Sequence, residues 1–295
     1  MKLSFGLYLK SFQNEKNINS NRFLHNANNA INYAIELYKR ESCEFFILHS
    51  YYLTGYSKNN LLSPEPTDKK LNEVKELVEK SMEKLKKHER FNNANNKHTF
   101  HFLNEFGSFN DVLKKVVDKE DIELILIGSE GGKEDKKLIQ GSNAVNTMEK
   151  VRNCPVFEIP NKVIFKNPNE IVFPTSFKTH YKEKELATLI EISKITNAPI
   201  RILYIQKDKE FSKKQWENKA LLNQILGATS FSHHVLYSSD IQEGVRCFFQ
   251  SRESKMIAFI NKKHNFFGSI FSNPMVKELG NNPNIPVLAL HDLRN

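Results

Sequence analysis

Apolar residues follow two alternating patterns along the chain, short continuous runs and helical repeats. The run CEFFILHS at residues 43–50 is nearly all apolar, which predicts a buried strand. In residues 68–90 the apolar side chains recur every three or four positions, which predicts a long amphipathic helix. By the same criteria we expect further helices at 28–41, 109–118 and 142–152, and further strands at 98–104, 122–127 and 155–159.

The alternation restarts after a polar, irregular stretch at residues 161–169. Strands that alternate with helices form a parallel sheet with right-handed crossovers. The halves also end alike, since Cys154-Pro155-Val156 corresponds to Ile285-Pro286-Val287. We therefore expect a tandem repeat of two five-stranded parallel α/β domains, at 1–162 and 163–295. In the second half the pattern predicts strands at 170–173, 199–206, 230–237, 255–261 and 286–291, and helices at 183–195, 213–226, 241–250 and 275–279.

Composition and charge narrow the class of protein. The 295 residues are 39% hydrophobic and 26% charged, a globular balance with room for two cores. The net charge is +9, but the lysines are dispersed among acidic residues, so we expect no nucleic-acid partner. No segment approaches ~18 uninterrupted apolar residues, and no secretory signal is apparent at the start, so we expect no membrane partner and a cytoplasmic protein.

The cysteines argue against a metal or disulfide framework. Cys43, Cys154 and Cys247 are far apart, which fits a reducing compartment and predicts three buried small hydrophobic residues. His233 and His234 are adjacent on a predicted strand and should face opposite sides of the sheet. No nucleophile has an identifiable base, so we assign no catalytic or metal-binding residues and do not expect a dedicated enzyme. The lone Trp216 is expected to anchor the packing of its helix.

A glycine-rich segment carries the candidate chemistry. The sequence GSEGGKEDKKLIQGSN begins at Gly128, directly after a buried strand, and opens a helix. Glycines allow positive φ angles and let phosphates approach the backbone. Ser142 and Asn143 stand at the start of the next helix, where unpaired N–H groups favour an anion. The segment is neither a P-loop nor a dinucleotide fingerprint, because it lacks GxxxxGK[ST] and GxGxxG.

The glycine spacing resembles the nucleotide-binding signature of the universal stress protein family. The matching positions are Gly128, Gly131, Gly141 and Ser142. The stretches Asn153-Cys154-Pro155-Val156 and Phe173-Pro174-Thr175-Ser176-Phe177 also resemble that family. The resemblance implies flavodoxin-like (Rossmann-like) domains flanked by helices and a regulatory role in the stress response. It also implies ATP or another adenine nucleotide, with or without Mg²⁺, as ligand. The nucleotide site would comprise Ile127, Gly128, Ser129, Gly131, Gly141, Ser142 and Asn143.

The resemblance also implies how the two domains pack. They would associate through their last strands as an intramolecular pseudo-dimer, and a homodimer is a further expectation. The second half has no glycine loop, because Phe266 and Phe267 stand where small residues would be needed. We expect it not to bind nucleotide; the alternative is another kind of anion site at residues 262–264.

The family's nucleotide-binding members carry an aspartate at the end of their first strand, and this chain departs from that pattern. The corresponding residue in the second half is Ser176. In the first half, either MKLSFGLYL forms the first strand and is followed by a long insertion, or the start of the domain has degenerated. His49, at the end of the second strand, could line the pocket. Three functions remain open: nucleotide binding, slow ATP hydrolysis, and partner binding without nucleotide.

Overall fold

The computed structural model describes residues 3–9, 20–51, 68–87, 95–129, 143–206, 210–261 and 285–291. Strands and helices alternate through both halves. The first half contains β1 (Leu3–Leu9), α1 (Ser20–Leu37), β2 (Cys43–Tyr51), α2 (Asp68–Lys86), β3 (His98–Phe106), α4 (Phe109–Glu120), β4 (Leu124–Ser129), α5 (Asn143–Lys150) and β5 (Val156–Pro160). The second half contains β6 (Ile171–Pro174), α6 (Glu183–Thr196), β7 (Ile200–Gln206), α7 (Lys213–Leu226), β8 (Phe231–Tyr237), α8 (Ile241–Arg252), β9 (Ile257–Asn261) and β10 (Val287–His291).

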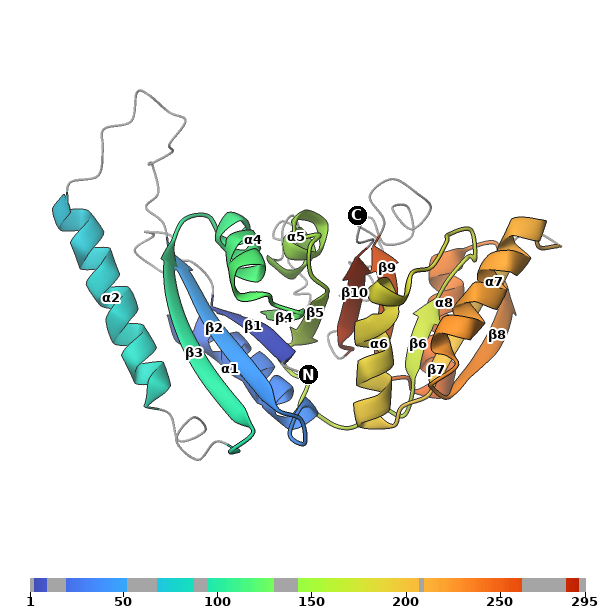
Figure 1. Cartoon of the computed structure of the whole chain (residues 1–295), viewed down its shortest axis with the longest axis horizontal. Helices are drawn as coiled ribbons and strands as arrows, with labels where there is room; N and C mark the ends of the chain where they lie inside the picture. Colours follow the sequence, from blue (N-terminus) through green and yellow to red (C-terminus); the bar gives the residue numbers. More distant parts are fainter. Residues whose placement is uncertain are drawn as a thin grey trace, which may run out of the picture.

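The described strands form one ten-stranded sheet that runs across the whole molecule (Figure 1). Its order is β3-β2-β1-β4-β5-β10-β9-β6-β7-β8. Within each half all strand pairs are parallel. Counted from its outer edge, each half has the strand order 3-2-1-4-5, which is the Rossmann-like order and not the 2-1-3-4-5 order of flavodoxin, and its fifth strand lies at the centre of the molecule. The predicted α/β class is therefore confirmed.

The halves meet where β5 and β10 pair antiparallel, with Phe157 opposite Leu288. All strands of the first half consequently run opposite to those of the second. The carboxyl ends of the strands in one half therefore lie on the same rim of the sheet as the amino ends in the other. Across this junction, the side-chain amide of Asn261 donates to the carbonyl of Met148 at 2.6 Å.

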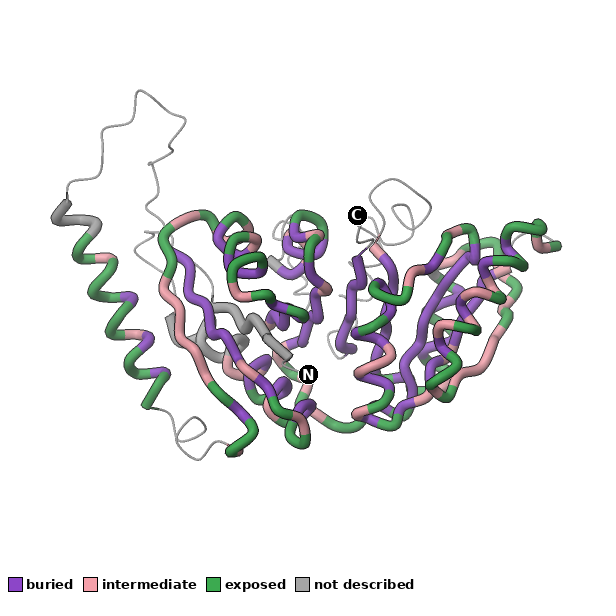
Figure 2. Tube along the Cα trace, viewed as in Figure 1, coloured by how far each residue is buried: buried purple, intermediate pink, exposed green. Residues whose placement is uncertain are grey.

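Alternate residues of the central strands enter two hydrophobic layers, one on each face of the sheet. One layer contains Phe45, Leu126, Phe157 and Leu288 and is covered by helices that include α1 and α6. The other contains Leu48, Ile127 and Phe259 and lies under α4, α5 and α8. Figure 2 shows the buried positions following the strands and the inward sides of the helices. The continuous apolar runs seen in the sequence are thus strands covered on both faces.

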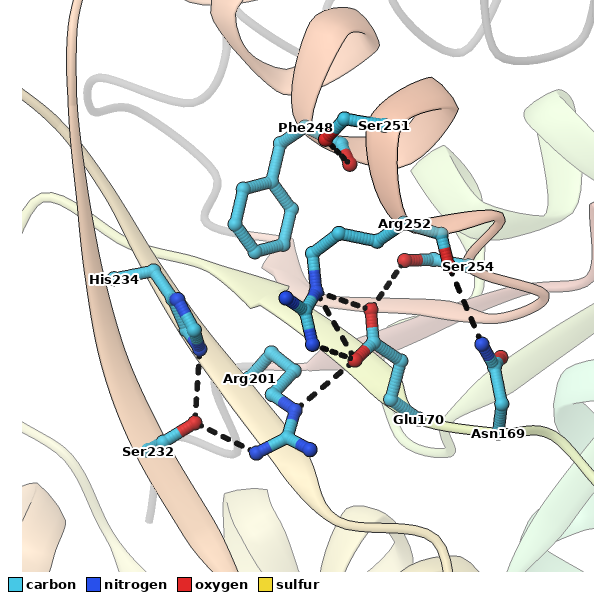
Figure 3. Close-up of polar contacts among 9 residues, drawn as sticks. All are labelled: Asn169, Glu170, Arg201, Ser232, His234, Phe248, Ser251, Arg252 and Ser254. Atoms are coloured by element: carbon cyan, nitrogen blue, oxygen red, sulfur yellow. Dashed lines mark hydrogen bonds and ion pairs between the residues drawn. The ribbon is translucent and has the colours of Figure 1, made fainter.

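A buried carboxylate connects elements at the amino-terminal ends of the strands of the second half through hydrogen bonds (Figure 3). Oε2 of Glu170 accepts a hydrogen bond from Arg201 Nε at 3.0 Å and from Arg252 Nη2 at 2.7 Å. The Ser254 hydroxyl donates to Oε1, and Arg201 also donates to the Ser232 hydroxyl at 2.8 Å. Although burial raises the pKa of Glu170, hydrogen bonds from Arg252, Ser254 and Arg201 lower it to about 2. The cluster joins β6, β7, β8 and α8.

Two sequence predictions about single residues are wrong. Trp216 does not anchor the packing of α7, because it is 57% exposed. The helix instead buries Gln215 and Asn218, whose amide groups donate to the backbone carbonyls of Ser176 and Phe177. Cys247 is exposed, whereas Cys43 and Cys154 are buried as expected. The predicted helix at 275–279 lies outside the described residues.

Gly107 joins β3 to α4 and is a site where glycine is required. Its φ is +145°, and a Cβ built there would lie 2.9 Å from Cγ2 of Val112. We expect Gly107→Ala to lower the free energy of unfolding by about 1–3 kcal/mol, through backbone strain and the clash with a buried side chain. Urea denaturation would measure this. Ala at Gly227, which has a φ of −54°, is the control and should change stability much less.

Candidate functional site

The candidate site of the first half lies where the strand order reverses, between β1 and β4. β1 pairs with β2 on one side and with β4 on the other, and all three run parallel. Crossovers on the two sides of such a point leave in opposite directions, and open α/β sheets bind ligands in the resulting crevice at the carboxyl ends. The structure assigns β1 to Leu3–Leu9, so the prediction that MKLSFGLYL forms the first strand is correct.

The end of β4 brings three predicted site residues to this rim. Ile127 is buried in the layer under α4 and α5, and Gly128 follows at the level of Ile159. Ser129 is 8% exposed, and its carbonyl accepts a hydrogen bond from the N–H of Asn161. Asn143 is the first residue of α5, as the sequence predicts for the helix after the loop. The remaining predicted residues, Gly131, Gly141 and Ser142, lie outside the described residues.

Helix α5 packs against β4 and β5 and is hydrogen-bonded to α4. Ala144, Met148 and Val151 are buried in the layer beneath the helix. The hydroxyl of Thr147, itself fully buried, donates to the side chain of Asn110 in the first turn of α4 at 3.2 Å. The first-turn N–H groups of α5, which have no carbonyl partner within the helix, therefore belong to a helix that is packed along its length.

Buried polar groups line the same rim beyond β1. His49 is 3% exposed and ends the apolar part of β2, level with Leu9 on one side and Asn104 on the other. Ser50 is fully buried, and neither its hydroxyl nor Oδ1 of Asn104 has a hydrogen-bond partner among the described residues. The sequence pointed only to His49. The pairing register of β2 with β3 is what reveals Asn104.

Glu158 is an unexpected buried acid beside the site. It lies on β5, opposite Ile127 on β4 and Val287 on β10, and is 8% exposed. Burial raises the pKa of this carboxyl, and the Ser129 hydroxyl offsets part of the rise. An acidic residue within an otherwise apolar strand was the sequence signal for this position.

In the second half, the described residues at the corresponding ends of β6 and β9 are in contact with other parts of the protein. Asn261 ends β9 as Ser129 ends β4, and its carbonyl accepts a hydrogen bond from Arg152, just after α5. Phe177 follows β6 with a φ of +56° and is 1% exposed, packed among aromatic rings that include Tyr204 and Phe211. The predicted role of Phe266 and Phe267 lies outside the described residues.

The histidines and acidic residues do not converge on a metal site. His233 contacts Asn223 of α7, whereas His234 contacts Ser232 and the ring of Phe248 in α8, so the two imidazoles face opposite sides as predicted. In the ranges described above, no group of three or more His, Cys, Asp or Glu residues could hold a metal ion. No helix in those ranges combines the length and apolarity needed to cross a membrane.

Comparison with solved structures supports the fold over the whole chain. A universal stress protein from Archaeoglobus fulgidus superposes with a TM-score of 0.65 at 14% identity, covering 98% of this chain and 96% of that one. A putative universal stress protein from Pseudomonas aeruginosa gives 0.51 at 9% identity, covering 98% and 92%. A functionally unknown protein from the same species also gives 0.51, at 8% identity over 98% and 92%. No curated protein matches the chain.

Sequence comparison places the first half in a family. The model of the universal stress protein family matches residues 23–159, from α1 through to β5. The match begins after β1. Residues 10–22 lie between that strand and the matched region. Residues 23–159 of this chain thus form a universal stress protein domain.

Proposed function

We propose that the protein is a regulatory protein that binds ATP or another adenine nucleotide at the carboxyl ends of β1 and β4. The observation that carries the proposal is the position of the glycine segment. It leaves β4 at Ser129 and returns as α5 at Asn143, at the point where the strand order reverses. Glycine spacing of this kind is a weak signal by itself, but it becomes informative in this strand–loop–helix context.

In this proposal the residues have distinct roles. The backbone at Gly128, Gly131 and Gly141 would let the phosphates approach. The N–H groups around Ser142 and Asn143, at the start of α5, would donate hydrogen bonds to the charged phosphate oxygens. Ile127 packs beneath the site, and Ser50, Asn104 and His49 offer polar groups along the rim. The nucleotide would act by shifting the protein between conformations or partners. We place this activity in the cytoplasm, consistent with three unpaired cysteines.

Calorimetric titration of ATP into the purified chain tests the proposal. We expect saturable heat, and Gly141→Val should weaken affinity about tenfold or more, because a branched Cβ would stand where the phosphates approach. Gly227→Val, at the end of α7, is the matched control and should retain full affinity. An absence of heat at millimolar ATP would leave partner binding without nucleotide as the function. A turnover assay on the same samples would detect the slow ATPase alternative.

Removing Mg²⁺ should change the affinity for ATP by less than about threefold. The reason is that β1, with the sequence LSFGLYL, supplies no carboxylate to hold a metal ion beside the phosphates. Residues that follow β1 directly, Lys10 and Ser11, are also not acidic. Titrations in EDTA and in excess Mg²⁺ would measure the difference, and a loss of binding in EDTA would show that another carboxylate holds the ion.

A further inference from the structure

The strand β8 forms one edge of the ten-stranded sheet. It pairs with β7 along its full length, from Phe231 to Tyr237, and no described strand pairs with its other side. Figure 1 shows it as the last strand at one end of the sheet. The edge at the opposite end is different, because α2 packs beside β3 and the ammonium of Lys86 lies 5.6 Å from the ring centroid of Phe102.

The composition of β8 leaves this edge unprotected. Its sequence, FSHHVLY, contains no lysine, no acid and no proline, which are the residues that natural edge strands use to discourage pairing. Val235 is 50% exposed and Tyr237 is 79% exposed. Because alternate residues share a face, these two lie on the α7 side of the sheet, where Trp216 is also exposed. Three of the large exposed apolar side chains thus occur at one corner of the molecule.

The histidines of the strand do not supply the missing charge at neutral pH. Burial, together with Lys219 and His234, lowers the pKa of His233 to about 4. Burial and the nearby Arg252 and Arg201 also lower the pKa of His234. An uncharged, seven-residue edge with exposed apolar side chains is a favourable template for another strand.

We propose that β8 is an interaction edge that pairs antiparallel with β8 of a second copy of this chain, about a two-fold axis at His234. Only this centre pairs all seven residues of each strand. It places Tyr237 opposite Phe231 of the partner subunit, and Val235 opposite His233 of the partner subunit. Such a surface is self-complementary, as a two-fold interface requires. The chain already uses antiparallel edge pairing, at β5 and β10, to join its own halves.

The charges beside the strand fit a second copy in this orientation. Helix α7 carries exposed Lys213 and Lys214 at its start, but no charged residue after Lys219. An antiparallel arrangement sets the lysine-bearing start of one α7 near the uncharged end of the other. The lysines of the two copies are therefore kept apart, and β8 itself has no Asp, Glu, Lys or Arg that could meet a like charge.

Sedimentation velocity on the full chain across micromolar concentrations tests the proposal. We expect a reversible species of twice the 34.3 kDa chain mass. Val235→Lys should weaken dimerisation roughly tenfold or more, because it puts two ammonium groups into the paired edge. Leu77→Lys is the matched control, since Leu77 is 63% exposed on α2, and it should dimerise normally. Circular dichroism would verify that both variants are folded.

A distance measurement tests the register and serves even if Val235→Lys does not fold. A nitroxide label would be attached to Tyr237→Cys in a Cys247→Ser background. In the proposed register the two labelled Cα atoms of a dimer are six residues apart along the paired strands, so their separation should be roughly 20 Å. A chain that stays monomeric at all concentrations would overturn the proposal. So would a dimer that Val235→Lys leaves intact, or one whose labels lie much farther apart.

Discussion

Glu170→Gln should lower the free energy of unfolding by about 2–4 kcal/mol at neutral pH. Removing one partner of a buried ion pair leaves the other charge uncompensated, and here two guanidinium groups lose the same partner. Glu170 is 3% exposed and accepts hydrogen bonds from Arg201, Arg252 and Ser254. The expected loss lies toward the lower end for buried pairs, because the side chains of Arg201 and Arg252 are 25% and 34% exposed. Urea denaturation at pH 7 would measure it.

The same substitution has a characteristic pH dependence. The pKa of Glu170 is about 2 in the folded protein, against an ordinary value of 4.5. The contribution of the ionised carboxylate to the free energy of unfolding is fully present above pH 4.5 and is lost as the pH falls toward 2. The difference in unfolding free energy between the wild type and Glu170→Gln should therefore shrink over that range. Glu243→Gln is the control, since it removes an exposed helical pair with Arg246 and should leave the unfolding midpoint unchanged. Equal losses in the two variants would contradict the role of the buried cluster.

Glu191→Gln should have the opposite effect and stabilise the protein by about 1–3 kcal/mol at pH 8. Glu191 lies on α6 of the second half, and acids of the first half act on it across the junction. Burial, followed by Glu123 and Glu41, raises its pKa from 4.5 to about 7. Glu191 also contributes to the raised pKa values of Tyr38 and Cys43, which shows that these groups lie close together.

The stabilisation should disappear in acid. Because the folded pKa of Glu191 is the higher one, the wild type carries no penalty below pH 4.5, and the cost of ionising a buried carboxyl develops as the pH rises through 7. Thermal unfolding of the wild type and of Glu191→Gln at pH 5 and at pH 8 would measure the difference in stability. Glu183→Gln, at an exposed position in the first turn of the same helix, should show no such change with pH. A gain for Glu191→Gln that is equal at both pH values would argue against a titrating carboxyl.

Hydrophobic patterning predicted most of the fold because each strand is covered on both faces. The apolar runs at residues 43–50 and 199–206 correspond closely to β2 and β7, and α7 has the predicted bounds. The first strand was harder, since ten residues separate it from α1 and the family pattern begins later. The prediction that Trp216 anchors the packing of α7 is wrong, because helical spacing does not reveal that polar Gln215 and Asn218 form part of the inward face.

The candidate site was predictable only in part. The glycine segment and Ser129 can be read from local sequence, since the backbone requirement is local. Asn104 cannot, because its relation to His49 depends on the register between β2 and β3. The same holds for Glu170, whose arginine partners lie 31 and 82 residues away in sequence. Contacts between distant segments depend on the three-dimensional pairing of strands, which no periodicity encodes.

The antiparallel junction of β5 with β10 has a consequence for biosynthesis. β5 is complete at Pro160, but the strand that covers its outer edge ends only at His291. At 5–20 residues per second, translation of the intervening segment takes roughly 7–26 s. For that interval a nascent first half would present an apolar, unpaired strand to the solvent. Chaperones that recognise extended apolar segments should therefore engage the nascent chain at β5, and release it once the second half has folded.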